Sequence, residues 1–78
     1  MKTVYVLAIG KRYGTRFLLK QNSTDPKTYT TLYVQDSAGG EWFNFGERGW
    51  STELNDLELN NFETFKEISE KDLLVELL

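Results

Sequence analysis

Hydrophobic and polar residues alternate through the first half of the chain with the period of two that is typical of β-strands. Residues 3–9 carry apolar side chains at both odd and even positions, which predicts a central strand covered on both faces. Residues 15–21 follow a turn bounded by Gly10 and Gly14 and also alternate. We expect this second segment to be the hairpin partner of the first.

The strand pattern continues after the loop at residues 22–27, which combines turn-forming residues with the only proline of the chain. Residues 28–35 alternate Thr, Tyr, Leu and Val as a third strand should, and residues 41–45 form a short and very aromatic fourth strand. Glycines in the turn between them can adopt positive φ angles. A fifth strand is expected over residues 50–54.

From about residue 55 the hydrophobic period changes in favour of a helix. Phe62, Phe65 and Ile68 recur every three residues, and Thr64 with Glu67 has the spacing of a capping box. This pattern predicts a first helix in the C-terminal third of the chain.

A second N-cap signature, residues 69–72, introduces a leucine-rich end that predicts a helix of about nine residues. So short a helix is not stable alone in water, so its leucines must dock onto the sheet or onto another molecule. The predicted fold is therefore α+β: an antiparallel four- to five-stranded meander with one or two short C-terminal helices packed on one face.

The length of 78 residues predicts one domain, 1–78, with a β meander over 1–54 and an acidic helical segment over 55–78. Disulfides are excluded because the chain has no cysteine, so we expect its two Trp, four Tyr and five Phe to stabilise a thin core. The absence of cysteine suits a cytoplasmic protein. No apolar stretch approaches the length of a membrane span.

The chain contains neither cysteine nor histidine, which removes thiolate chemistry, zinc–thiolate sites and histidine-based triads. Paired carboxylates need a cleft that raises one pKa, and a domain this small can hardly enclose one. We therefore expect no enzymatic activity and predict no catalytic, cofactor-binding or metal-binding residues.

The formal net charge of −3 conceals a strong asymmetry along the chain. Residues 1–51 hold seven basic and four acidic residues, whereas residues 52–78 hold eight acidic residues and only two lysines. Such a separation of charge can orient a partner during an encounter.

The acidic tail is the first candidate for a contact surface. Glu63, Glu67 and Glu70 would form one stripe on a continuous helix, and Asp56 and Glu58 would extend it. A row of carboxylates can imitate nucleic-acid phosphates and occupy a basic groove on a protein that handles nucleic acid. Two lysines at i, i+4 spacing from these acids also fit an ordinary solvated helix face, and this alternative stays open.

The second candidate is the aromatic cluster of Trp42, Phe43 and Trp50. Successive residues of a strand point to opposite faces, so Trp42 and Phe43 cannot both enter one core. The face left without a helix would then be an aromatic contact surface. The alternative is a curled sheet that buries both sides.

A third group is basic and lies in and beside the first turn. Three cations and a tyrosine there could bind phosphate or stack against a base, although the solvated charges of an ordinary surface loop are the favoured explanation. The residues of this candidate single-stranded nucleic-acid site are Lys11, Arg12, Tyr13, Arg16 and Lys20.

These observations favour a non-enzymatic protein–protein interaction module whose protein partner is not identified by the sequence. In general character the chain is similar to the small inhibitors that phages and mobile elements direct against the nucleic-acid-handling machinery of a host. No motif carries that likeness. A single-stranded nucleic-acid binder is the alternative, which the net negative charge disfavours. A homodimeric structural protein is the third hypothesis.

Overall fold

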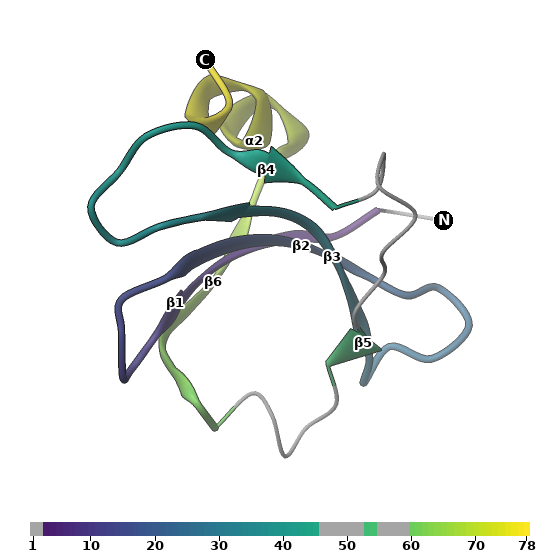
Figure 1. Ribbon diagram of the computed structural model, residues 1–78. Helices are drawn as coiled ribbons and strands as arrows, with labels where there is room; N and C mark the ends of the chain where they lie inside the picture. The colour runs from purple at the N-terminus through teal and green to yellow at the C-terminus, as the bar shows by residue number, and fades with distance from the viewer. Residues whose placement is uncertain (1–2, 46–52, 55–59) are drawn as a thin grey trace.

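The computed structural model describes residues 3–45, 53–54 and 60–78 (Figure 1). In these residues an antiparallel sheet is followed by one C-terminal helix, which confirms the predicted α+β class. The strands are β1 (Tyr5–Gly10), β2 (Arg16–Gln21), β3 (Tyr29–Gln35), β4 (Phe43–Asn44), β5 (Glu53–Leu54) and β6 (Phe62–Ile68), and the helix is α2 (Glu70–Glu76).

The first four strands follow the predicted meander, because each pairs antiparallel with the next. The order across the sheet is β4-β3-β2-β1-β6, with β5 paired to β3. The last strand, β6, therefore lies at the edge of the sheet opposite β4 and pairs with β1. Of the predicted fifth strand, the described part is Glu53–Leu54, and residues 50–52 lie outside the described residues.

The helix predicted around Phe62, Phe65 and Ile68 is wrong, because this segment is strand β6. A β-bulge explains the misleading three-residue period. Ile9 is opposite Thr64 and Gly10 is opposite Phe62, so one residue of β6 is skipped in the register. The bulge returns Phe62 to the face of Phe65, and their ring centroids lie 6.0 Å apart. Residues three apart in a regular strand would face opposite sides.

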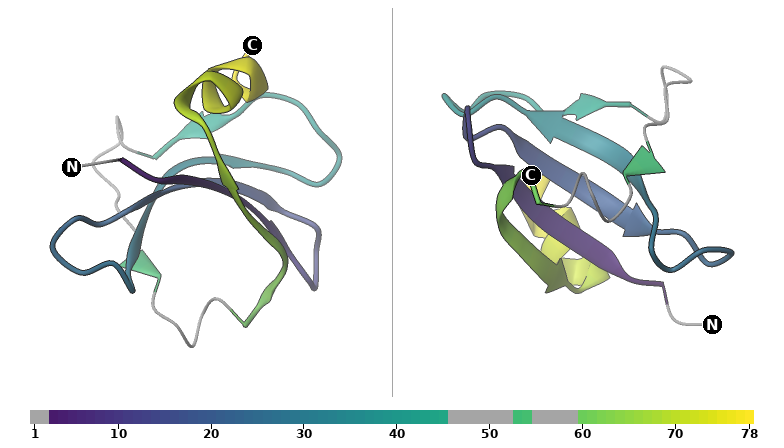
Figure 2. Two further views of the ribbon diagram at one scale, coloured as in Figure 1. Left: turned by 180° about the vertical axis from the view of Figure 1, so that it is seen from behind. Right: turned by 90° about the horizontal axis from the view of Figure 1, so that it is seen from below.

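Both faces of the β1–β2 pair are buried. Leu18 and Leu19 are adjacent in β2, point to opposite faces and are both 0% exposed. Leu18 is opposite Tyr33, which lines a pocket together with α2, so Leu18 lies on the face that carries the helix. We call this the outer face, and the face of Leu19 the inner face. The sheet is curved, and α2 crosses its outer side (Figures 1 and 2).

The inner face holds the main core of the domain. Val6, Ala8 and Leu19 form its buried centre, and partly buried aromatic residues surround them. Phe17 and Phe62 meet edge to face at 5.3 Å, and Tyr29 and Phe65 do so at 5.1 Å. These are preferred geometries for aromatic pairs, and they place the four rings around the core of the inner face.

The outer face is covered by α2, which begins at the predicted N-cap. The Ser69 hydroxyl accepts a hydrogen bond from the backbone N–H of Asp72 at 3.1 Å, and Glu70 and Asp72 place negative charge in the first turn. Leu73 is the buried residue of the helix and is 6% exposed. A seven-residue helix depends on this packing because its own hydrogen bonds do not stabilise it in water.

Adjacent leucines of α2 provide a matched test of this packing. We expect Leu73→Ala to lower the free energy of unfolding by about 2 to 5 kcal/mol, because it leaves a cavity under the helix. Leu74→Ala, one residue along and 56% exposed, should change it by no more than about 0.5 kcal/mol. Urea denaturation followed by circular dichroism measures both, and equal losses would contradict the packing described here.

Candidate functional site

The helix α2 carries apolar side chains on two sides, and only one side is packed against the domain. Leu73 is buried, and Glu76 and Leu77, three and four residues later, are partly buried. The opposite side displays Leu74 at 56% exposure and Val75 at 58% exposure. A short amphipathic helix normally gives its solvent side to polar residues. The exposed leucine and valine are therefore unexpected unless something covers them.

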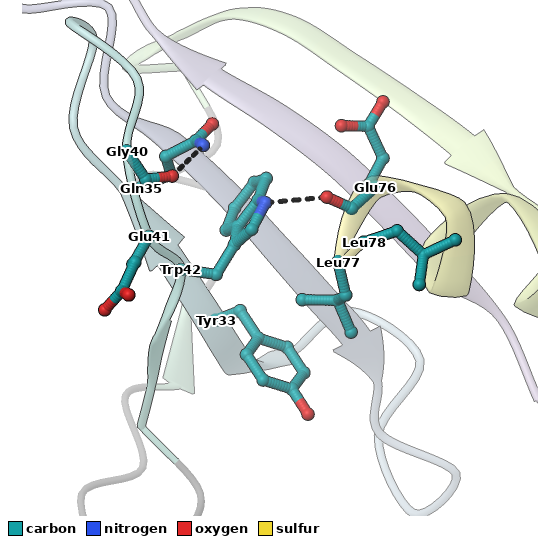
Figure 3. A pocket seen from close by; sticks show the side chains of 8 residues that line it. All are labelled: Tyr33, Gln35, Gly40, Glu41, Trp42, Glu76, Leu77 and Leu78. Carbon is teal, nitrogen blue, oxygen red and sulfur yellow. Dashed lines mark hydrogen bonds between the residues drawn. The ribbon is translucent and has the colours of Figure 1, made fainter.

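Beside the C-terminal end of α2 lies a pocket with a volume of about 490 Å³ (Figure 3). One wall comes from β3 and the loop that follows it, and the other from the end of the helix. The residues that line it include Tyr33, Gln35, Glu41, Trp42, Glu76 and Leu77.

Two hydrogen bonds fix the geometry of this pocket. The Trp42 indole N–H donates to the backbone oxygen of Glu76 at 2.9 Å and joins the loop to the helix across 34 residues of sequence. Gln35 Nε2 donates to the backbone oxygen of Gly40 at 2.7 Å and holds the loop over β3. The other amide atom, Gln35 Oε1, is buried and has no hydrogen-bond partner in the described part of the chain.

The aromatic residues predicted as one contact cluster do not lie together on one face of the sheet. Trp42 is partly buried and contacts α2 on the outer side, so this side chain helps to hold the helix on the sheet. Phe43 is 50% exposed and lies opposite Val34, which places it on the inner side at β4. The two side chains thus diverge as the strand geometry predicts. Trp50 lies outside the described residues.

The predicted acidic helical stripe is not formed. Glu63 and Glu67 are exposed residues of strand β6, whereas Glu70 begins α2. Glu67 and Glu70 both line a hollow that Thr3 also lines, and Glu63 is not among the residues that line it. Asp56 and Glu58 lie outside the described residues.

The two lysines expected at i, i+4 spacing from these acids on a helix are not on a shared helix face either. Lys66 lies on strand β6 and Lys71 on α2, so no helix face joins either to an acidic residue four positions away. The choice between a phosphate-like row and a solvated helix face therefore no longer arises.

The basic residues do not gather into one patch either. Lys11, Arg12 and Tyr13 are exposed in the β1–β2 turn, where the Arg12 guanidinium carbon lies 5.3 Å from the Tyr13 ring centroid. Arg16 and Lys20 share the outer face of β2 but are about 13 Å apart along the strand. Leu18 lies between them and is fully buried.

Sequence reasoning missed Gln35 and Glu76 as pocket residues. It named Leu74 only as one of the C-terminal leucines that could contact the sheet or another molecule, and it did not single out Val75. The pocket is made by a loop and a helix end that are far apart in sequence, and no spacing predicts their contact. The apolar side of α2 did leave a signal, because a leucine-rich helix too short to be stable alone was expected to dock onto the sheet or another molecule.

The Trp42–Glu76 hydrogen bond generates a prediction for helix docking. We expect Trp42→Phe to weaken the attachment of α2 by about 1 kcal/mol, because it removes the N–H donor. Amide exchange of the α2 backbone should then be about fivefold faster while exchange in β1 is unchanged. Tyr33→Phe, which removes a hydroxyl from the same pocket, is the control and should leave α2 unaffected. Equal exchange rates in wild type and Trp42→Phe would refute the role of the bond.

Two searches of the described residues gave negative results. No helix there is long and apolar enough to cross a membrane, and no three acidic side chains lie close enough to hold a metal ion. Comparison of the chain with family models, with curated proteins and with solved structures gave no match. Functional inference therefore rests on the surfaces of this chain alone.

Proposed function

We propose that this protein is a non-enzymatic protein-binding module whose contact surface is the outward side of α2. The observation that supports this proposal is the exposure of Leu74 and Val75 on a helix whose opposite side already packs on the sheet. Contiguous exposed apolar side chains on small proteins are typical of interaction sites. The remaining lining residues of this surface are Glu70, Lys71, Leu77 and Leu78.

The size of the surface indicates how the partner binds. Complete burial of a leucine or valine side chain contributes about 1.5 to 3 kcal/mol, so two such residues can anchor a complex but cannot make it tight alone. A helix of seven residues is only about 10 Å long. Both limits favour a partner that receives α2 in an apolar groove, with further contacts around its rim.

Self-association through α2 is the competing hypothesis. A stable dimer buries about 800 Å² on each subunit, far more than two half-exposed side chains of one short helix present. A second copy therefore fits this surface less well than a groove on another protein.

Nucleic-acid binding receives less support from the geometry. Continuous tracking of a phosphate backbone needs neighbouring cations. Here Lys20 lies at the other end of β2 from the turn, and the buried Leu18 stands between it and Arg16.

The test replaces the apolar side chains of α2 with positive charge. The double variant Leu74→Lys/Val75→Lys should retain the fold, because both side chains are exposed and cations suit the C-terminal half of a helix. Its capture of partners from a lysate of the source organism should fall at least tenfold relative to wild type, as quantified by mass spectrometry.

The matched control is Ser23→Lys/Thr24→Lys, which adds the same charge to an exposed loop and should capture as wild type does. The same set of proteins captured in equal amounts by the α2 variant would refute the proposal. Light scattering of the wild type and of the α2 variant tests the competing hypothesis of self-association. A dimer mass for the wild type together with a monomer mass for the variant would assign the surface to a second copy of the chain.

A further inference from the structure

We propose that the pocket between the Trp42 loop and the end of α2 binds the guanidinium group of an arginine side chain. This inference deepens the proposed function and rests on it, because the arginine would belong to the protein partner. The pocket adjoins the proposed contact surface, since Leu77 and Leu78 line both. A partner segment seated on α2 could therefore place one side chain into it.

The polar chemistry of the pocket is that of a hydrogen-bond acceptor. Among the residues that the structure describes, its lining contains the carboxylates of Glu41 and Glu76 and no lysine or arginine. In Figure 3 the Glu76 carboxylate and the Gln35 amide lie on the same side of the Trp42 indole, whereas the Glu41 carboxylate points away from it. The first two groups flank one region of the pocket, and Glu41 contributes negative charge at its rim.

A buried acceptor in this region lacks a donor. Gln35 Oε1 has no hydrogen-bond partner among the described residues, while Nε2 of the same amide is engaged with Gly40. A buried acceptor without a partner is unfavourable, and most such groups in folded proteins are satisfied. This oxygen is closed to solvent, so an incoming donor reaches it only when the Gln35 side chain turns toward the pocket.

The aromatic walls favour a guanidinium over an ammonium group. A guanidinium is planar, stacks on aromatic faces and is weakly hydrated, and both Trp42 and Tyr33 line the pocket. It also presents several N–H groups in a rigid fork, which matches the two oxygens of a carboxylate such as that of Glu76. A lysine ammonium is a strongly hydrated point charge and matches this arrangement less well.

The experiment titrates the full chain with the capped peptide Gly-Arg-Gly and follows the side-chain resonances of the Trp42 indole and the Gln35 amide by NMR. We expect saturable shifts in the millimolar range, as for a single side chain. The capped citrulline peptide, which has the same shape without the charge, should bind at least about tenfold more weakly. Absence of saturable shifts with the arginine peptide, or equal binding of both peptides, would overturn the proposal.

Matched variants locate the site. Glu76→Gln should weaken binding of the arginine peptide about tenfold, because it removes a charged acceptor, whereas Glu63→Gln removes a carboxylate from β6 and should have no effect. Unchanged binding by Glu76→Gln would refute the assignment. So would binding seen only after Arg16→Ala, because Arg16 lies opposite Gln35 in the register and its own guanidinium would then be the occupant.

Failure of the guanidinium pocket can be distinguished from failure of the proposed contact surface on α2. The neutral variant Leu74→Ser/Val75→Ser removes the apolar side of α2 and leaves every lining residue of the pocket in place. Unlike the lysine variant, it adds no positive charge within a Debye length of Glu76, so it should still bind the arginine peptide within about twofold even where it no longer captures a partner. Loss of peptide binding in that variant would contradict a separate guanidinium pocket.

Discussion

The structure depends on the burial of both faces of one β-hairpin. Leu18 and Leu19 are consecutive in β2 and both are fully buried, so the sheet needs cover on its two sides at the same place. Curvature and the aromatic residues of β3 and β6 provide the inner cover, and α2 provides the outer one. A chain of 78 residues has little material for two layers of cover, which explains why so short a helix is retained.

The need for cover on the outer face also determines what α2 exposes. Leu73 and the partly buried Leu77 pack the helix against the domain, with the Ser69 cap at one end and the Trp42 N–H at the other. Leu74 and Val75 take no part in these contacts and remain at the surface. Apolar residues that neither pack nor cap require another explanation, and partner binding is the one that their position supports.

Much of the fold could be predicted from the sequence because its signals are local. The first three strands, the turns between them and the Ser69 cap each depend on residues close together in the chain. The bulge in β6 could not be predicted, since it becomes visible only against β1, fifty residues away. Phe62 and Phe65 share a face in a bulged strand as they would in a helix, so the same spacing fits both structures. The acidic stripe was wrong for the same reason, because Glu63 and Glu67 were placed on that helix.

The candidate site was harder to predict than the fold because it combines a loop with a helix end. Trp42 was singled out as a contact residue for its type, yet its N–H is used within the chain. Its ring still forms a wall of the pocket, and the bond that fixes it holds Glu76 at the pocket that Gln35 also lines. The contact that secures the helix thus also gathers a carboxylate, an unpaired amide oxygen and two aromatic rings. Under the proposed function, stability and recognition share one interaction, so evolution of the binding surface would be constrained by the docking of α2.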